Sequence, residues 1–344
     1  MIIGARTGAW SPSGKNPPAY GGLCFTAEAA NSSVQLTAVG SAPVVTLVKS
    51  FDGVNWEAYA VGEVIDLPST GDFVYLAAGE GGNETLGSSA SVYHQFVING
   101  LVAASGDITS IRSFDLEQTP LAKYCYLSMF YGCTGLTSAP ELPATTLASS
   151  CYRSIFEGCT GLTSAPELPA TTLAPSCYLS MFSGCTGLTS APELPAITLT
   201  TTCYRSMFYG CTGLTSAPEL PATTLAVQCY SSMFEGCTGL TSAPELPAIT
   251  LTTACYRHMF YGCTGLTSAP ELPATKLVRN CYEYMFEGCT NLSLIKVRFT
   301  TWGAQTSNWV SNIKSTGTFY KLSSLPEEHG TSKIPTGWTV VNID

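Results

Sequence analysis

The sequence predicts a mainly β protein with short helical turns, in which a β-sandwich is followed by a solenoid of seven 26-residue coils and a C-terminal cap. The first observation is a repeat: fourteen of the fifteen cysteines form two columns of seven, and every step within a column is 26 residues. A fixed period between about 20 and 50 residues is typical of a solenoid, whose units bury their apolar faces by stacking. The second observation is a series of short alternating segments in the first hundred residues, which predicts an immunoglobulin-like sandwich.

Five regions are therefore expected along the chain. They are a Gly-, Pro- and Ser-rich arm over 1–22, the sandwich over 23–104, a junction or N-cap over 105–121, the solenoid over 122–298 and a capping region over 299–344. The capping region contains three of the five tryptophans and is predicted to cover the open end of the solenoid.

Six strands are expected in the sandwich. Residues 34–39 alternate between apolar and polar, and 44–48 form an apolar run typical of a buried strand. Asp52 and Gly53 predict a hairpin turn before a strand over 54–59. The remaining strands are predicted over 61–67, 72–77 and 93–98.

Each repeat contains the pattern Cys-Tyr-x-x-Met-Phe-x-Gly-Cys-Thr-Gly-Leu-Thr-Ser-Ala-Pro-Glu-Leu-Pro-Ala. In the second copy, 150–157 predicts one and a half helical turns that end at Gly158 in a left-handed C-cap. Residues 162–168 then predict an extended segment that is broken by proline. If the coils stack at the spacing of paired strands, about 4.8 Å, six steps make a rod roughly 29 Å long.

The pattern Phe-x-Gly-Cys-Thr-x-Leu-Thr-x-Ala-Pro-Glu-Leu-Pro-Ala-Thr-Thr-Leu resembles the repeats of BspA-like surface proteins of gut Bacteroidales and of their phages and prophages. The resemblance spans 121–298, and segments at 93–107 and 307–340 resemble the flanks of the same group. The opening segment 3–10 is similar to the start of phage and prophage structural proteins. This resemblance implies a leucine-rich-repeat solenoid and a role in adhesion.

Composition excludes several classes of function. A net charge of −9 and a pI near 4.9 do not suit a protein that binds nucleic acid. The apolar runs are too short for membrane insertion, which needs about 18 residues or more. The three histidines, His94, His258 and His329, lie far apart, and no nucleophile elbow, phosphate-binding loop or zinc-binding pair is present. We therefore expect no enzyme activity, no cofactor and no metal.

The cysteine columns have three interpretations. The two cysteines of a coil are eight residues apart with no histidine near them, which does not suit zinc. Disulfides between stacked copies would need Cβ atoms closer than parallel stacking allows, and a column of seven cannot pair completely. Buried free thiols that act as small apolar fillers are the favoured interpretation.

Two sets of side chains on the solenoid are candidates for ligand binding. A ladder that is identical in six copies predicts a binding surface for a repetitive polymer such as a capsular polysaccharide, and the alternative is recent duplication. Its residues are Thr137, Glu141, Thr163, Glu167, Thr189, Glu193, Thr215, Glu219, Thr241, Glu245, Thr267 and Glu271.

The second set is a variable outer strip, formed by the residues two and six after the first Cys of each copy. Its main members are Tyr131, Arg153, Glu157, Arg205, Tyr209, Arg257 and Tyr261. Because two such residues are four apart, they would share one side of a helical turn, where Arg153 and Glu157 are placed to pair. The strip is either a binding surface or an outer face that has drifted neutrally.

The favoured function is that of a phage or prophage virion component, a tail fibre or decoration protein, which contacts the host surface or its glycans through the solenoid. Residues 1–6 lack the basic and apolar regions of a signal peptide, which favours the virion surface over export by the general route. The alternatives are a bacterial cell-surface adhesin of the BspA-like type and a structural spacer. The expected partners are a host cell-surface glycan or protein and other virion proteins, which would contact Arg6 and Trp10 of the arm; a homo-oligomer is left open.

Overall fold

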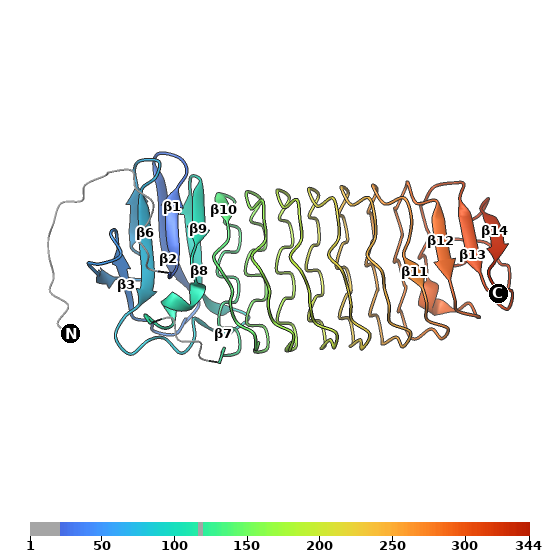
Figure 1. Ribbon diagram of the computed structural model, residues 1–344, viewed down its shortest axis with the longest axis horizontal. Helices are drawn as coiled ribbons and strands as arrows, with labels where there is room; N and C mark the ends of the chain where they lie inside the picture. The colour runs from blue at the N-terminus through green and yellow to red at the C-terminus, as the bar shows by residue number, and fades with distance from the viewer. Residues whose placement is uncertain (1–20, 116–119) are drawn as a thin grey trace.

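The computed structural model describes residues 21–115 and 120–344, and it has the shape of a rod with a sandwich at one end and a stack of coils beyond it (Figure 1). The described part is almost entirely non-helical, with two short 3-10 helices, η1 (Ile108–Ile111) and η2 (Ala304–Thr306), which confirms the mainly β class. The strands are β1 (Cys24–Ala27), β2 (Ser32–Val39), β3 (Leu47–Ser50), β4 (Glu57–Tyr59), β5 (Val64–Leu67), β6 (Phe73–Ala78), β7 (Gly87–Ser89), β8 (Val92–Asn99), β9 (Val102–Ser105), β10 (Leu136–Ser138), β11 (Glu271–Leu272), β12 (Leu294–Val297), β13 (Thr318–Lys321) and β14 (Thr339–Asn342).

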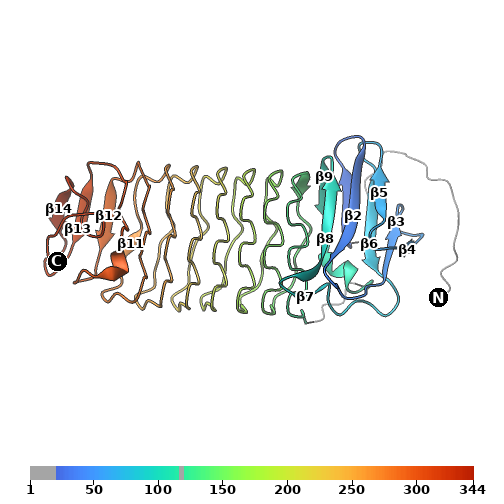
Figure 2. The same ribbon diagram turned by 180° about the vertical axis from the view of Figure 1, so that it is seen from behind.

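The sandwich consists of two sheets. One has the strand order β10-β9-β1-β6-β3-β4, and the other, seen in Figure 2, has the order β5-β2-β8-β7. Their inner faces meet in an apolar core in which the rings of Phe25 and Phe96 lie 4.9 Å apart. All pairs within the two sheets are antiparallel except β9 with β10.

Each of the six predicted strand segments overlaps a strand, namely β2, β3, β4, β5, β6 and β8. The predicted buried strand over 44–48 is wrong in its first half, because β3 begins only at Leu47 and Val44 is 97% exposed. The sequence did not indicate β1, β7 or β9, which are short and rich in Ala, Ser, Thr, Gly and Cys. The prediction of a tight hairpin turn at Asp52 and Gly53 is wrong, because β3 ends at Ser50 and β4 begins only at Glu57. The Asp52 carboxylate instead stabilises a wider loop by accepting hydrogen bonds from the backbone N–H groups of Val54 and Asn55 at 2.8 and 2.7 Å.

The sandwich closes the N-terminal end of the coil stack. Strand β10 of the first coil pairs in parallel with β9 of the sandwich. The ring of Phe96 stacks on that of Phe130 at 5.1 Å, and the Phe96 N–H donates to Met129 O at 2.7 Å. The Cys133 thiol donates to Phe96 O, with 3.2 Å between sulfur and oxygen. Phe96 thus takes the place that the phenylalanine of a preceding coil occupies elsewhere in the stack.

The segment predicted as helical turns is a series of tight turns. Ser150, Ser154 and Gly158 all have left-handed backbone conformations, with φ of 56°, 54° and 76°. Alternate N–H groups bond three residues back, as Ile155 does to Tyr152 O at 3.3 Å. The N–H groups between them donate to the next coil: Tyr152 to Cys177 O, Ser154 to Leu179 O, Phe156 to Met181 O and Gly158 to Ser183 O, at 2.7–3.1 Å. The helical prediction was wrong because half of these donors serve the neighbouring coil, although Gly158 does have the predicted left-handed φ.

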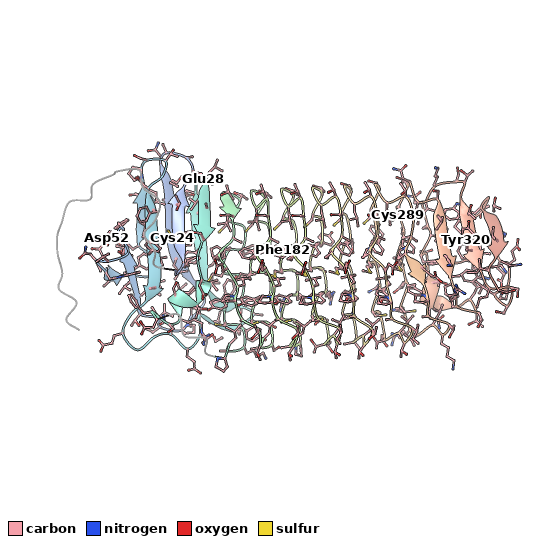
Figure 3. All side chains as sticks on the ribbon, in the orientation of Figure 1. Cys24, Glu28, Asp52, Phe182, Cys289 and Tyr320 are labelled. Carbon is pink, nitrogen blue, oxygen red and sulfur yellow. The ribbon has the colours of Figure 1, made fainter. Side chains whose placement is uncertain are left out.

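The coil interior is a set of stacked columns. Neighbouring phenylalanine rings of the coils have centroids 5.4–5.7 Å apart, and the tyrosine rings 5.5–6.0 Å. Figure 3 places Phe182 and Cys289 within this stack. The expected step of 4.8 Å is therefore too short, and so is the rod length derived from it. Opposite the turns, successive coils share mostly isolated bridges such as Ser164 with Ser190, so the spacing of a continuous sheet does not apply.

The region after residue 299 continues the stack. Strands β11, β12, β13 and β14 form a parallel sheet. Trp309 is fully buried above the last phenylalanine of the repeats, Phe286, whose N–H donates to Trp309 O at 2.9 Å. The indole N–H groups of Trp302, Trp309 and Trp338 donate to Pro326 O, Lys333 O and Lys314 O.

All fifteen cysteines are buried free thiols. The second column does more than fill space, because each thiol from Cys159 to Cys289 donates to the carbonyl of the phenylalanine in the preceding coil at 2.9–3.0 Å. Burial raises the pKa of Cys185, Cys237 and Cys289 to about 12. Burial also raises the pKa of the stacked tyrosines, such as Tyr178, well above its usual value.

Alkaline pH is expected to unfold the solenoid. The folded-state pKa of these thiols lies above the unfolded value near 9.0, so their stabilising effect is complete below pH 9 and is lost between pH 9 and about 12. At pH 10 the loss is on the order of 1 kcal/mol per thiol. Urea unfolding at pH 7.5 and 10 measures the effect, and replacing Cys185, Cys211 and Cys237 by alanine should make the pH dependence shallower. An unchanged urea midpoint between these pH values would contradict the prediction.

Candidate functional site

One side of the coils presents three rows of side chains, most of them exposed, which we call the sheet face. In the second coil, Glu167, Pro169 and Thr171 are exposed while Leu168 and Ala170 between them are buried, as expected of extended chain. The same alternation recurs in the third, fourth and fifth coils. The Glu row is Glu141, Glu167, Glu193, Glu219, Glu245 and Glu271; the Pro row is Pro143, Pro169, Pro195, Pro221, Pro247 and Pro273; the third row is Thr145, Thr171, Ile197, Thr223, Ile249 and Thr275.

The threonines of the predicted ladder have a structural role. The hydroxyl of Thr137 donates to Val102 O of the sandwich at 3.3 Å. The hydroxyls of Thr163, Thr189, Thr241 and Thr267 donate to the carbonyl of the equivalent threonine one coil earlier, at 3.3–3.5 Å. These bonds join the coils and account for the repetition of threonine here; Thr215 is exposed at the same position.

The glutamates of the predicted ladder are different, because all six are exposed. Glu271, at the C-terminal end of the row, forms ion pairs with Lys296 and Arg298, both at 2.7 Å. Hydrogen bonds from these two side chains lower the pKa of Glu271. No ion pair joins the other five carboxylates to any residue that the structure describes.

Sequence reasoning missed the apolar part of the sheet face. Ile197 and Ile249 are 62% and 71% exposed, in alternate coils, at a position where the other copies have threonine. The exposed prolines lie beside them along the chain. The sequence did contain an indication that this position is exposed, since isoleucine replaces threonine there in two copies and a buried position would not accept both.

The outer strip lies on the opposite, turn-forming side, which we call the turn face. Tyr131, Tyr209 and Tyr261 are exposed there, as is Arg205, and Arg153 and Glu157 are half-buried. The predicted Arg153–Glu157 pair is not formed. An ion pair on this face joins equivalent positions of adjacent coils instead, Arg257 to Glu283 at 2.7 Å, because tight turns replace the helix on which the predicted pairing depended.

The histidines are dispersed. His94 is buried in the sandwich with Nδ1 2.9 Å from Leu86 O, and burial lowers its pKa. His258 lies on the turn face 3.5 Å from the Glu235 carboxylate, and His329 lies 3.6 Å from Glu327. Among the described residues, no three His, Cys, Asp or Glu side chains are grouped so that they could hold a metal ion.

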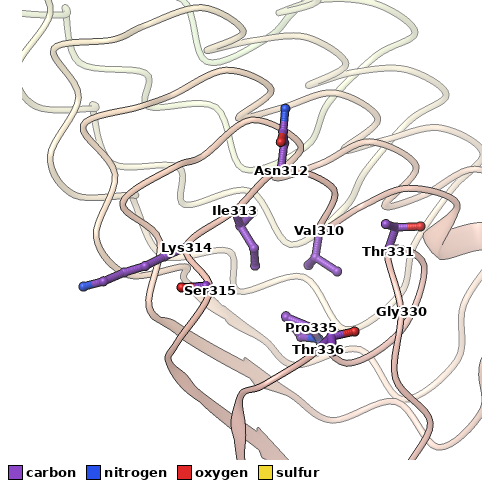
Figure 4. A pocket seen from close by; sticks show the side chains of 9 residues that line it. All are labelled: Val310, Asn312, Ile313, Lys314, Ser315, Gly330, Thr331, Pro335 and Thr336. Atoms are coloured by element: carbon purple, nitrogen blue, oxygen red, sulfur yellow. The ribbon is translucent and has the colours of Figure 1, made fainter.

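A shallow hollow lies between the last two turns of the rod, lined by Val310, Ile313, Pro335 and neighbouring polar residues (Figure 4). Its volume of about 170 Å³ is below the range of about 300–1,000 Å³ that is usual for small-molecule sites. The Lys314 side chain points away from it. The docking-arm residues Arg6 and Trp10 lie outside the described residues.

Comparison with known proteins finds one family. A model described as the BspA type leucine rich repeat region matches residues 107–241 and 201–325, with six copies, and these ranges cover more than half of the chain. No curated protein matches the sequence. Within the described residues, no helix combines the length and the hydropathy that crossing a bilayer requires.

Proposed function

Because the chain belongs to the family of BspA-type leucine-rich-repeat proteins, we propose that it is a non-enzymatic surface-binding protein of the adhesin type, which holds its target through the solenoid. The target is a glycan or protein on a host cell surface. Repeat proteins of this kind use long, regular surfaces for binding, and the sheet face is such a surface here.

The observation that carries the proposal is the Glu row. Some exposed positions in the coils differ between copies, as Ile197 and Thr223 do, whereas others, such as Thr160 and Thr186, are identical. The glutamate is identical in six copies, and for five of them no described ion pair explains it. A repeated binding role accounts for six exposed glutamates of which five have no described ion pair, and recent duplication is the alternative that the binding assay tests.

The finer proposal places the protein in a phage or prophage particle, as a tail-fibre or decoration component. It is supported by the resemblance of residues 3–10 to the start of phage and prophage structural proteins. In this arrangement the N-terminal arm contacts other virion proteins and the solenoid extends outward. Mass spectrometry of purified particles tests it, and absence from every particle would favour a cell-surface adhesin instead.

Loss of the central glutamates is expected to reduce binding to whole cells. Glu193→Gln with Glu219→Gln keeps the shape of both side chains and removes two of the unpaired charges, so the bound fraction of fluorescently labelled protein should fall severalfold. The control is Glu28→Gln with Glu80→Gln, which removes two exposed charges of the sandwich, outside both candidate surfaces of the solenoid. Equal binding by the sheet-face variant and the wild type would argue against the sheet face as the binding surface.

A further inference from the structure

The sheet face carries an apolar strip that no described residue covers. Pro169, Pro195, Pro221 and Pro247 are exposed in consecutive coils, and Ile197 and Ile249 project beside them. Exposed apolar residues that form a contiguous strip, instead of single scattered residues, are typical of a surface that binds a partner. The partner must therefore present an apolar stripe of its own.

The charge of the face defines one edge of that partner. The Glu row borders the apolar strip on one side, and its five carboxylates from Glu141 to Glu245 are unpaired among the described residues. A polymer with negative groups is repelled along the whole row. A complementary partner carries a basic edge next to its apolar stripe.

The spacing of the coils defines the form of the partner. Successive coils are displaced by 5.4–6.0 Å, judged from the stacked Phe and Tyr rings. An α-helix has a pitch of about 5.4 Å, so a helix parallel to the rod places one side chain of each turn opposite each coil. The Glu row and the third row are four residues apart in extended chain, roughly 13 Å, which is close to the diameter of a helix with its side chains.

A sugar chain with a similar repeat would also match the coil spacing, but the exposed prolines and the two isoleucines beside the Glu row favour a helix. Aromatic rings are the usual apolar platform for ring stacking, and the exposed tyrosines Tyr131, Tyr209 and Tyr261 lie on the turn face. The three rows of the sheet face contain Glu, Pro, Thr and Ile only. Proline and isoleucine suit the Leu, Ile or Val side chains of an amphipathic helix.

We propose that the sheet face docks an amphipathic α-helix with a basic edge, which lies along the axis of the rod. Its Lys or Arg side chains pair with the Glu row at one per turn, and its apolar stripe packs on the Pro row and on Ile197 and Ile249. This inference rests on the proposed function and names the class of partner that the same face binds.

The test uses the full chain and synthetic peptides of about 21 residues, or six helical turns. One peptide has a Leu stripe beside a Lys edge, the second has the same composition in scrambled order, and the third has Glu in place of Lys. We expect the first peptide to bind, measured by fluorescence anisotropy, with an affinity at least tenfold above that of the other two. Its affinity should fall as salt is added, since exposed charge pairs are screened.

Variants of the protein test whether the peptide binds to the sheet face. Glu193→Gln with Glu219→Gln is expected to weaken peptide binding about tenfold. Ile197→Thr with Ile249→Thr, which introduces the residue that other coils have, should also weaken it about tenfold. The charge-matched pair Glu28→Gln with Glu80→Gln, two exposed residues of the sandwich, should leave it unchanged. Circular dichroism of each variant confirms that the fold is intact.

Three results would overturn the inference: equal binding of the ordered and scrambled peptides, equal binding by the sheet-face variants and the wild type, or glutamate-dependent binding of dextran without binding of the peptide. The last result assigns the face to a neutral glycan. The whole-cell assay separates this inference from the proposed function. If cells are bound and the peptide is not, only the helix proposal fails; if the peptide is bound and cells are not, the adhesin proposal fails.

Discussion

Replacement of Gly213 by alanine is expected to destabilise the stack by about 3 kcal/mol, at the upper end of what overpacking costs. A Cβ atom at Gly213 would lie 2.5 Å from Thr186 O and 3.1 Å from Leu188 O, both in the preceding coil. These are backbone atoms, so relief requires the third and fourth coils to separate, which weakens the contacts of the columns between them. Urea unfolding followed by circular dichroism measures the loss.

The chain provides its own controls for this substitution. The seventh coil has Asn291 at the equivalent position, and its side-chain amide donates to Thr264 O at 2.8 Å. Gly213→Asn is therefore expected to recover about 1 kcal/mol of the loss through the matching bond to Thr186 O. Gly210→Ala tests the effect of backbone conformation without a steric clash. Gly210 has a φ of +69°, and a Cβ atom there would lie 4.0 Å from its nearest neighbour, Gly184 Cα. This substitution should cost about 1–2 kcal/mol through conformation alone. A Gly213→Ala protein as stable as the wild type would contradict the close approach of the coils.

Replacement of Phe96 by alanine is expected to cost about 3–5 kcal/mol and to loosen the first coil. Its ring is fully buried between Phe25 of the sandwich and Phe130 of the first coil, at centroid distances of 4.9 and 5.1 Å. Removing it leaves a cavity where the sandwich supports the stack. Calorimetry measures the stability, and hydrogen exchange at 129–133 reports whether the first coil opens more readily.

The neighbouring residue serves as the control. Val97 lies on the same strand with its side chain 37% exposed, and Val97→Ala should change stability by less than about 1 kcal/mol. If Phe96→Ala lowers stability without loss of hydrogen-exchange protection at 129–133, Phe96 stabilises the sandwich alone and is not the support of the stack.

The stacking of the solenoid was predictable because the 26-residue spacing of cysteines repeats an interior position. Burial of Cys, Tyr, Phe and Leu in columns follows directly from that period, since identical units can bury an apolar face only against each other. The strands with clear alternation, such as β2 and β8, were also predictable. Small residues in β1 and β9 gave no such pattern, although β9 is the strand to which the first coil pairs.

The turn segment was not predictable from local pattern. The spacing of Tyr152 and Phe156 fits one side of a helix, but the N–H groups of both residues donate to the next coil. Helix propensity reflects backbone hydrogen bonds within one segment and does not account for hydrogen bonds between neighbouring repeats. The left-handed φ of Ser154 illustrates the same limit, because only its place in the stack stabilises that conformation.

The candidate surfaces were partly predictable. Identity among copies singled out threonine and glutamate together, and only the structure separates them, because Thr163 and its equivalents bond to the preceding coil while most of the glutamates have no described ion-pair partner. The pairing of Arg153 with Glu157 failed with the helix on which it was based. The exposure of Ile249 depends on which side of the extended segment faces outward, and the alternation of Leu246 and Ala248 settles this in the structure.

The two ends of the solenoid are closed by different parts of the chain, Phe96 of the sandwich and Trp309 of the C-terminal region, while the second to sixth coils are nearly identical in sequence. An in-frame duplication or deletion of one repeat therefore lengthens or shortens the rod by a single step and leaves both closing contacts intact. The reach of the rod from the sandwich and the number of residues in each surface row then change together. The gene can adjust both by recombination between its own near-identical repeats, without any new amino-acid sequence.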